Sequence, residues 1–252
     1  MFKKYWKFFV IFWSVVLVGI IGVFVFFWLI SAGKLGFMPT FEELENPNNR
    51  FASEVYFADG PIMNRYFEKE NRKYIEYREI PQSVIDALIA TEDVRFYDHS
   101  GVDVRGLFRV AKGLLTANTS AGGGSTISQQ LAKMLFPRES DLNVFELAIR
   151  KFREWVIAVR LEKSYTKEEI LTMYLNKYDF LNLAVGISSA ADIYFQVPLD
   201  SLKVEQAAML IGMAKNSSYY NPVRRPELTL NRRNVVLSQM YKYDKITREE
   251  CD

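Results

Sequence analysis

Residues 122–133 read GGGSTISQQLAK, and this stretch decides most about the fold and the chemistry of the chain. Three glycines stand directly before a run with helical periodicity, so we expect a loop that becomes a helix at about residue 126. Thr126, Gln130 and Lys133 follow at i, i+4 and i+7 and share one polar face, which leaves another face for apolar packing. Backbone N–H groups at the helix start and an ammonium further along suit an anion, most naturally a phosphate group. An ordinary loop followed by an amphipathic helix is the alternative.

The composition narrows the classes of protein to consider. The chain has 252 residues, a formal net charge of +2, 49% hydrophobic residues and 15% aromatic residues. A charge so close to neutral gives no reason to expect a nucleic-acid partner. The single cysteine, Cys251, excludes a disulfide framework, and with the single histidine, His99, it leaves no cluster of metal ligands to predict.

Residues 8–30 read FFVIFWSVVLVGIIGVFVFFWLI and carry no charge. Such a stretch is long enough to cross about 30 Å of hydrocarbon as a helix. Three lysines precede it within residues 1–7, so the positive-inside rule predicts a cytoplasmic tail and an extracytoplasmic remainder. The chain is therefore expected at the cell membrane as a single-pass protein, with cleavage as a signal peptide near 31–33 as the alternative.

The rest of the chain changes character along its length. Residues 31–50 carry Gly, Pro and Asn and are predicted to be a stalk. Residues 51–80 are predicted to be a small β element, with a hairpin around Asp59-Gly60 and a third extended piece at 74–77. Residues 81–245 have helical periodicity and indicate a mainly α-helical domain, and 246–252 are expected to be the truncated end of a longer chain. Helices are expected at about 83–96, 103–116, 126–136, 143–163, 167–176, 186–195, 203–214 and 227–242.

Glu92 is a candidate general base. It lies at i+4 from Leu88 and i+3 from Ile89, on the apolar face of its predicted helix. Apolar surroundings disfavour the charged form of a carboxyl, and such a group can act as a base near neutral pH. A structural ion pair at the helix end, with Arg95 or another cation, is the alternative.

Several residues beside the candidate base are predicted to cap and orient the backbone. Ser83 is expected to cap the first helix of the domain, and Thr166 the helix at 167–176 through a capping box. Asp93 and His99 are expected to orient the turn that ends at Gly101 rather than to carry chemistry.

The run RKFRE at 150–154 adds a second carboxylate next to two cations. Arg150 and Glu154 lie at i and i+4 and share one face of their predicted helix. This pattern suits a site that holds a base and an anionic leaving group. The alternative is a solvent-exposed stripe of charged residues, which such runs form more often.

Taken together, these stretches resemble the motifs of family 51 glycosyltransferases, the peptidoglycan glycosyltransferase domain of class A penicillin-binding proteins. The matching residues are Glu92, Asp93, Phe96, His99 and Gly101, then Gly123 to Lys133, then Arg150, Lys151 and Glu154, then Lys167 to Asn176, and last Arg232 or Arg233 with Val236 and Leu237. The chain departs from the usual family residues at Met134, Leu181, Val185, Gln196 and Val197.

The resemblance implies a lysozyme-like α-helical fold and a moenomycin-sensitive enzyme of cell-wall biogenesis. Such an enzyme polymerises lipid II by inverting transfer from an undecaprenyl-pyrophosphate donor to an acceptor sugar 4-hydroxyl. The implied partners are lipid II, the growing glycan chain, the bacterial inner membrane and other cell-wall synthesis proteins. The resemblance also implies a divalent cation, magnesium or manganese, that supports the pyrophosphate.

The resemblance gives individual residues roles. It makes Glu92 the general base and Glu154 the second essential carboxylate. The implied substrate-binding residues are Lys133, Arg150 and Lys151 for the pyrophosphate, Ser125, Thr126 and Gln130 for the donor site, and Lys112 as a basic residue near the donor. The implied structural residues are Asp93, Phe96, His99, Gly101 and Asn176.

Two other functions stay open from the sequence. A membrane-anchored lysozyme-like lytic enzyme would also use a glutamate in a helical fold, although it would not need the cations Lys133, Arg150 and Lys151. A catalytically inactive scaffold is the second alternative, and the joint presence of Glu92, Gln130, Lys133 and Glu154 speaks against it.

Overall fold

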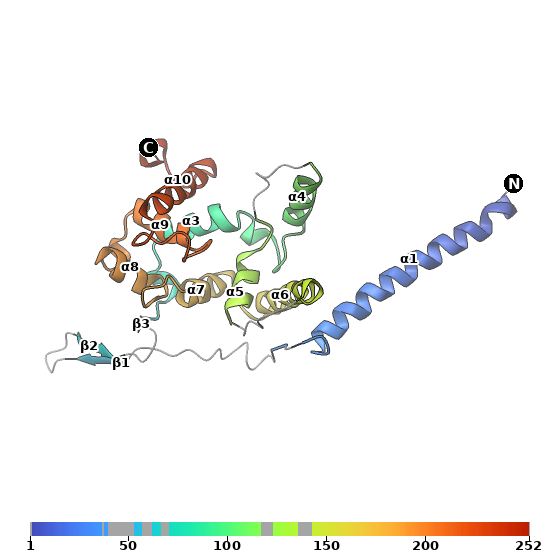
Figure 1. Cartoon of the computed structure of the whole chain (residues 1–252), viewed down its shortest axis with the longest axis horizontal. Coiled ribbons are helices and arrows are strands. Elements are labelled where there is room, and N and C mark those ends of the chain that lie inside the picture. Colours follow the sequence, from blue (N-terminus) through green and yellow to red (C-terminus); the bar gives the residue numbers. More distant parts are fainter. Residues whose placement is uncertain are drawn as a thin grey trace.

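The computed structural model of the chain describes residues 2–36, 38–39, 53–56, 62–66, 71–116, 123–135 and 143–251. A helical body forms most of it, and one long helix extends away from this body (Figure 1). The elements in chain order are α1 (Phe2–Ser31), β1 (Ser53–Tyr56), β2 (Ile62–Tyr66), β3 (Asn71–Arg72), α3 (Gln82–Glu92), α4 (Val104–Leu115), α5 (Ile127–Leu135), α6 (Val144–Ser164), α7 (Lys167–Lys177), β4 (Ala184–Val185), α8 (Ile187–Phe195), α9 (Val204–Met213), α10 (Pro226–Lys242) and α11 (Arg248–Cys251). The predicted mainly α-helical class with a small β element and one candidate membrane helix is confirmed.

The expected helices α4 to α10 are confirmed, with bounds that differ from the predicted ones by about one residue at most. The start of α3 also agrees within one residue, but its predicted end at residue 96 and its predicted cap Ser83 were wrong. Pro81 is the N-cap of α3, so Ser83 lies inside the helix and caps nothing. The helix ends at Glu92 because Asp93 leaves the helical conformation, with φ −156°, and its carboxylate accepts hydrogen bonds from outside the helix.

The predicted hairpin is confirmed in its strands. β1 and β2 pair antiparallel, with Ser53 opposite Tyr66, and its Asp59-Gly60 turn lies outside the described residues. The third extended piece predicted at 74–77 forms no strand of its own: Glu76 is extended, and Tyr77 already belongs to the next turn. The strand lies earlier, at β3, and pairs in parallel with β4, while Tyr77–Glu79 form a 3₁₀ turn.

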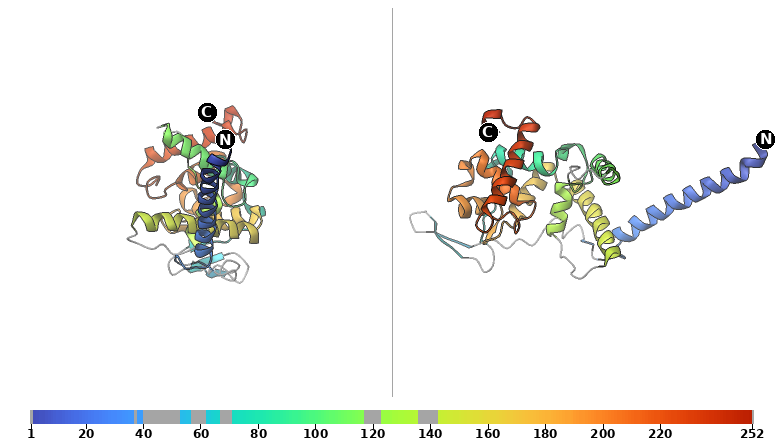
Figure 2. Two further views of the ribbon diagram at one scale, coloured as in Figure 1. Left: turned by 90° about the vertical axis from the view of Figure 1, so that its right-hand side faces the viewer. Right: turned by 45° about the horizontal axis from the view of Figure 1, so that its top comes forward.

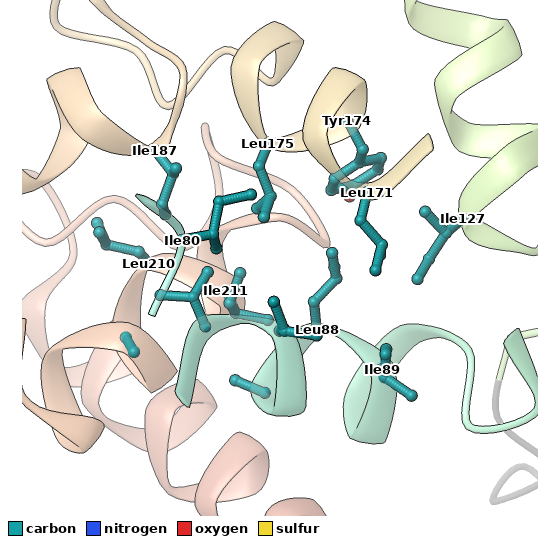
Figure 3. Close-up of a cluster of buried hydrophobic side chains, with 14 of the residues drawn as sticks. Ile80, Leu88, Ile89, Ile127, Leu171, Tyr174, Leu175, Ile187, Leu210 and Ile211 are labelled. Carbon is teal, nitrogen blue, oxygen red and sulfur yellow. The ribbon is translucent and has the colours of Figure 1, made fainter. Parts of the chain in front are cut away.

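One hydrophobic core joins α3, α5, α7, α8 and α9 (Figure 3). Leu88 of α3, Ile127 of α5 and Leu171 of α7 are fully buried in it, and Ile211 of α9 packs from another side. Burial of each such side chain stabilises the fold by about 1.5–3 kcal/mol relative to leaving it exposed. The core therefore fixes α3 against α5, and both helices carry residues of the candidate site.

The helix α1 fits a membrane anchor. Its stretch Trp6–Ser31 is apolar and long enough to cross a membrane, and the most apolar part of it is not buried against the body. The stretch includes the predicted span 8–30. Figure 2 shows that α1 meets the body next to α6 and then runs away from it.

The end of α1 is attached to α6 by aromatic and polar contacts. Phe26 and Phe27 place their ring centroids 5.4 and 5.7 Å from that of Phe152 on α6. The Arg160 guanidinium donates to the backbone carbonyls of Ser31, at 2.9 Å, and Pro39, at 3.0 Å. The described beginning of the predicted stalk thus lies against the body, and its residues 40–50 lie outside the described part of the chain.

Asn176 connects the segment before α3 to the end of α7. Its side chain accepts from the Ile75 amide at 3.0 Å and donates to the Ile75 carbonyl at 2.8 Å, and all of these groups are buried. The Asn176 side chain therefore satisfies both the N–H and the C=O of Ile75. Buried backbone groups need such partners because they have no access to water.

Asn176→Ala should lower the free energy of unfolding by about 2–4 kcal/mol, because it leaves two buried backbone groups without partners. Urea denaturation of the full chain in detergent micelles measures this. The matched control is Asn231→Ala on the exposed face of α10, where we expect a change within about 0.5 kcal/mol. Equal stabilities of the two variants would contradict the role given to Asn176.

Candidate active site

Glu92 is the last residue of α3, and its carboxylate is held between two other helices. Gln130 of α5 donates from Nε2 to Oε2 at 3.0 Å, and Arg232 of α10 donates from Nη2 to Oε1 at 3.2 Å. The Glu92 side chain is only 13% exposed and the Arg232 side chain 11%. Each carboxylate oxygen has one donor and keeps acceptor capacity for a further group.

The amide of Gln130 is fixed from its other end by Tyr174 of α7, whose hydroxyl donates to Gln130 Oε1 at 3.0 Å. Burial raises the pKa of Tyr174 well above its ordinary value, and the charge of Glu92 raises it further. Tyr174 is therefore a neutral donor, which orients the Gln130 amide so that its NH₂ group faces Glu92.

Arg232 reaches Glu92 from the middle of α10, where its Nε also donates to the Gly212 carbonyl at 3.4 Å. The guanidinium carbon lies 5.8 Å from the ring centroid of Tyr220. Arg233 points elsewhere and donates to Asn234 Oδ1 at 2.9 Å. The structure thus assigns the motif arginine that the sequence left open, and it is Arg232.

Asp93 binds the start of α5, next to Glu92 in the chain. Its Oδ2 accepts from the Ile127 amide at 3.0 Å and lies 3.0 Å from Nε2 of His99, whose Nδ1 accepts from the Gly101 amide. The sequence predicted an anion at this helix start, and the structure places the Asp93 carboxylate there, while the predicted phosphate stays a prediction. The Ile127 amide binds the carboxylate of Asp93 within the same chain.

Gly101 lies where the turn between α3 and α4 approaches the backbone of α6. Its φ is +94°, and a Cβ at this position would lie 2.7 Å from the Ala158 carbonyl carbon. Glycine is thus required both by the backbone conformation and by the close approach. The Gly101 carbonyl accepts from the hydroxyl of Thr126 at 2.7 Å, and that hydroxyl also accepts from the Gln129 amide. Thr126 is 1% exposed, and its hydroxyl acts as the cap of α5.

Lys167 of α7 supports the turn that follows Asp93. Lys167 lies 4.4 Å from the ring centroid of the buried Phe96 and donates to the His99 carbonyl at 2.6 Å. The same ammonium pairs with Glu162 at 2.7 Å, and Glu162 also accepts from Ser128 of α5. The predicted Thr166 capping box at the start of α7 is confirmed.

Glu154, the second candidate carboxylate, lies on α6 and is 8% exposed. Lys151 donates to Glu154 Oε2 at 2.8 Å and to the Ser125 hydroxyl at 3.0 Å. The i, i+3 partner Lys151 thus holds Glu154, where the sequence had suggested its i, i+4 neighbour Arg150. Ser125 connects this pair to the loop that carries the glycines.

A cavity of about 420 Å³ opens beside Glu92. It lies between the end of α3, α4, the loop before α5 and the end of α10. Its lining residues are Ala90, Thr91, Glu92, Asp93, Val94, Arg95, Asp103, Arg109, Lys112, Gly113, Thr116, Gly123, Gly124, Ser125, Thr126, Gln239, Lys242 and Tyr243. Glu92, Lys112, Ser125 and Thr126 of the predicted site are thus brought to one cavity.

Comparison with known proteins shows which family the chain belongs to. The sequence model of the transglycosylase family matches residues 59–241, which is most of the chain. The chain belongs to the transglycosylase family. The match includes every predicted site residue from Glu92 to Asn176, and Arg232 as well.

Curated relatives of this transglycosylase chain carry the name penicillin-binding protein 1A. That of Escherichia coli is 37% identical over 215 residues, or 85% of this chain and 25% of the relative, and that of Pseudomonas aeruginosa is 37% identical over 212 residues, or 84% and 25%. The chain therefore spans about a quarter of the length of these relatives. The crystal structure of penicillin-binding protein 1A from Haemophilus influenzae has 23% identity and a TM-score of 0.45, covering 81% of this chain and 20% of its own.

The three residues predicted to bind pyrophosphate, Lys133, Arg150 and Lys151, all lie apart from the cavity lining. Lys133 is exposed on α5, one turn after Gln130, and Arg150 is half-buried on α6. Among the described residues, no group of three or more His, Cys, Asp or Glu side chains could hold a metal ion.

Sequence reasoning had given no site role to four residues that the structure places around Glu92 or its cavity. These are Tyr174, Arg232, Arg109 and Lys242. For Tyr174 and Arg232 a signal existed, since both belong to family motifs. Arg109 gave only a weak signal, three residues before Lys112 on the same helix, and Lys242 gave none.

Asp93→Ala should lower the free energy of unfolding by about 2–4 kcal/mol, because the Ile127 amide and the His99 ring lose a buried charged acceptor. Denaturation of the full chain in detergent, compared with the exposed variant Asp98→Ala, measures the effect. If both variants unfold at the same urea concentration, Asp93 does not hold the start of α5.

Proposed function

We propose that this chain is the peptidoglycan glycosyltransferase part of a bacterial cell-wall enzyme and polymerises lipid II into glycan strands. The observation that carries the proposal is the low exposure of Glu92 together with its two donors from different helices. Membership of the transglycosylase family and the names of the relatives support the same reaction class. The match covers only about a quarter of the length of the relatives, so their other activities are not assigned to this chain.

In the proposed reaction, Glu92 accepts the proton of the acceptor 4-hydroxyl. The hydroxyl oxygen attacks the anomeric carbon of the donor sugar, the bond to the pyrophosphate oxygen breaks, and undecaprenyl pyrophosphate leaves with inversion at that carbon. Gln130 and Arg232 hold the carboxylate in one orientation, and a fixed base within reach of its proton can contribute about 10²–10⁴-fold to the rate.

The cations of α5 and α6 are proposed to receive the negative charge of the leaving group. Lys151 is already held by Glu154 and Ser125, so its ammonium is placed before the substrate arrives. Arg150 and Lys133 are proposed to contact the same pyrophosphate from neighbouring turns, and Gln130, Ser125 and Thr126 to border the donor. Glu154 orients Lys151 in this scheme.

The described residues do not form a protein cage for the divalent cation that the family resemblance implies. Magnesium or manganese would therefore be held mainly by the diphosphate oxygens of the substrate, as is usual for magnesium in phosphate sites, and would offset their charge. Every step above runs through side chains of the chain itself.

The apolar helix α1 supports a place at the bacterial inner membrane, with residues 1–7 in the cytoplasm and the body outside it. A body attached to the membrane meets a lipid-linked substrate at a raised effective concentration. The Arg160 contacts with Ser31 and Pro39 would keep α6 close to the membrane surface. The proposed partners are lipid II, the growing glycan and other cell-wall synthesis proteins.

The test uses the full chain in detergent or liposomes with labelled lipid II, and polymer is followed on a gel with and without moenomycin. Wild-type protein should make polymer that moenomycin blocks, and Glu92→Gln should be slower by at least about 100-fold because it cannot accept the proton. The exposed variant Glu205→Gln on α9 is the control and should keep its rate.

Two outcomes would contradict this function. Release of soluble fragments from purified cell-wall glycan, without polymer from lipid II, would indicate a lytic enzyme. Binding of lipid II without polymer, unchanged by Glu92→Gln, would indicate a scaffold.

A further inference from the structure

Two adjacent backbone carbonyls at the end of α9, those of Gly212 and Met213, accept hydrogen bonds from side chains of two other helices. Arg232 of α10 donates from Nε to the Gly212 carbonyl at 3.4 Å, and the hydroxyl of Tyr178 donates to the Met213 carbonyl at 3.0 Å. Tyr178 is the C-cap of α7, so its side chain attaches the end of α7 to the end of α9. Arg232 also donates to Glu92, which connects the end of α9 to one oxygen of the proposed base.

A second route leads from Tyr178 to the other oxygen of Glu92. The Tyr178 ring stacks on the ring of Tyr174, with centroids 5.8 Å apart and 26° between the ring planes. Tyr174 donates to Gln130 Oε1 at 3.0 Å, and Gln130 donates from Nε2 to Glu92 Oε2 at 3.0 Å. The two routes therefore start at adjacent residues of α9 and end on the two oxygens of one carboxylate.

The Tyr178 side chain is a neutral donor. Burial raises the pKa of its hydroxyl to about 12, with hydrogen bonding to Ser217 opposing the rise and the charge of Glu92 adding to it. A phenol with such a pKa keeps its proton near neutral pH and continues to donate to the Met213 carbonyl. The hydrogen bond that places the Tyr178 ring is therefore present under the conditions of the proposed reaction.

The position of the Tyr174 ring decides which end of the Gln130 amide faces Glu92. The Tyr174 hydroxyl is a donor, so it selects the amide oxygen of Gln130 and leaves the NH₂ group for the carboxylate. A reversed amide would place its oxygen next to the carboxylate, and two acceptors would then face each other. Misplacement of a reacting group by about 1 Å can cost about 100-fold in rate, so the support of this ring matters for the reaction.

We propose that Tyr178 is a positioning residue for Glu92 and acts through Tyr174 and Gln130. The proposal rests on the proposed function and names a further residue of the same site. Tyr178 touches no reacting atom in this scheme, because it fixes the Tyr174 ring from the end of α9. Its hydroxyl is the essential part, since the hydroxyl attaches the ring to Met213. Removal of the hydroxyl alone should therefore slow the reaction without weakening the binding of substrate.

The first experiment measures polymerisation kinetics of Tyr178→Phe with labelled lipid II, using the full chain in detergent. This variant keeps the stacked ring, and kcat should fall about three- to tenfold, the factor that one net hydrogen bond is worth, while KM stays within about twofold. The matched control is Tyr194→Phe on α8, which removes a hydroxyl that donates to the Phe180 carbonyl at 2.7 Å and should keep its kcat. An unchanged kcat in Tyr178→Phe, or a rise of KM alone, would overturn the proposal.

The second experiment repeats the substitution in a Gln130→Leu background and separates positioning from a general structural role. Leucine has no amide to orient, so Tyr178→Phe should lower kcat by less than about twofold there. A merely structural effect would lower kcat by the same factor in both backgrounds, and that result would also overturn the proposal. Urea denaturation of each variant in detergent gives the folded fraction, and rates are compared per folded protein.

A third measurement needs no turnover and uses nuclear magnetic resonance of the full chain with isotope-labelled glutamine side chains. Loss of a signal in Gln130→Leu identifies the NH₂ group of Gln130. Tyr178→Phe should shift this signal and speed its hydrogen exchange, whereas Tyr194→Phe should leave it unchanged. If wild-type protein makes no polymer but the Gln130 signal responds to Tyr178→Phe, the positioning contact stands and the proposed function fails. If polymer forms normally and neither kcat nor the signal responds, the function stands and the positioning role fails.

Discussion

The structure depends on two adjacent carboxylates at the end of α3 that bind the same neighbouring helix at two points. Asp93 accepts from the Ile127 amide at the start of α5, and Glu92 accepts from the Gln130 side chain one turn later. The helix α5 is thus fixed in position and rotation relative to α3. Arg232 adds a third helix, α10, to the same pair. The reacting group of the proposed enzyme is therefore also the point where three helices meet.

Most of the other motif residues act by keeping this junction in place. Lys167 packs on Phe96 and holds the turn after Asp93, and Gly101 lets that turn approach α6. The helix α6 carries Glu154 and Lys151 on the side of the site and receives α1 on the side of Phe152. The apolar helix α1, Glu154 and Glu92 are thus connected through packed helices of the body.

The sequence predicted the helices well because their apolar periodicity is strong, as α4 to α10 show. It placed the end of α3 four residues too late, because the helix ends where Asp93 turns away to bind the Ile127 amide, and apolar periodicity does not report such a contact. It indicated an anion at the start of α5 but could not show that the Asp93 carboxylate binds the first amide of that helix. It could not choose between Arg232 and Arg233, because both lie three or four residues from the buried Val236. Lys242 was missed because only the packing of α10 against α3 brings it to the cavity.

In the proposed reaction, Gln130 and Arg232 both act by positioning the carboxylate of Glu92. A kinetic double-mutant cycle with Gln130→Leu and Arg232→Gln, measured as the initial rate of lipid II consumption, tests this most directly. Residues that act through one group are coupled, so the loss in the double variant should be smaller than the product of the two single losses, by an interaction free energy of at least about 1 kcal/mol. Losses that multiply would show that the two side chains act independently, and would contradict a shared positioning role at Glu92.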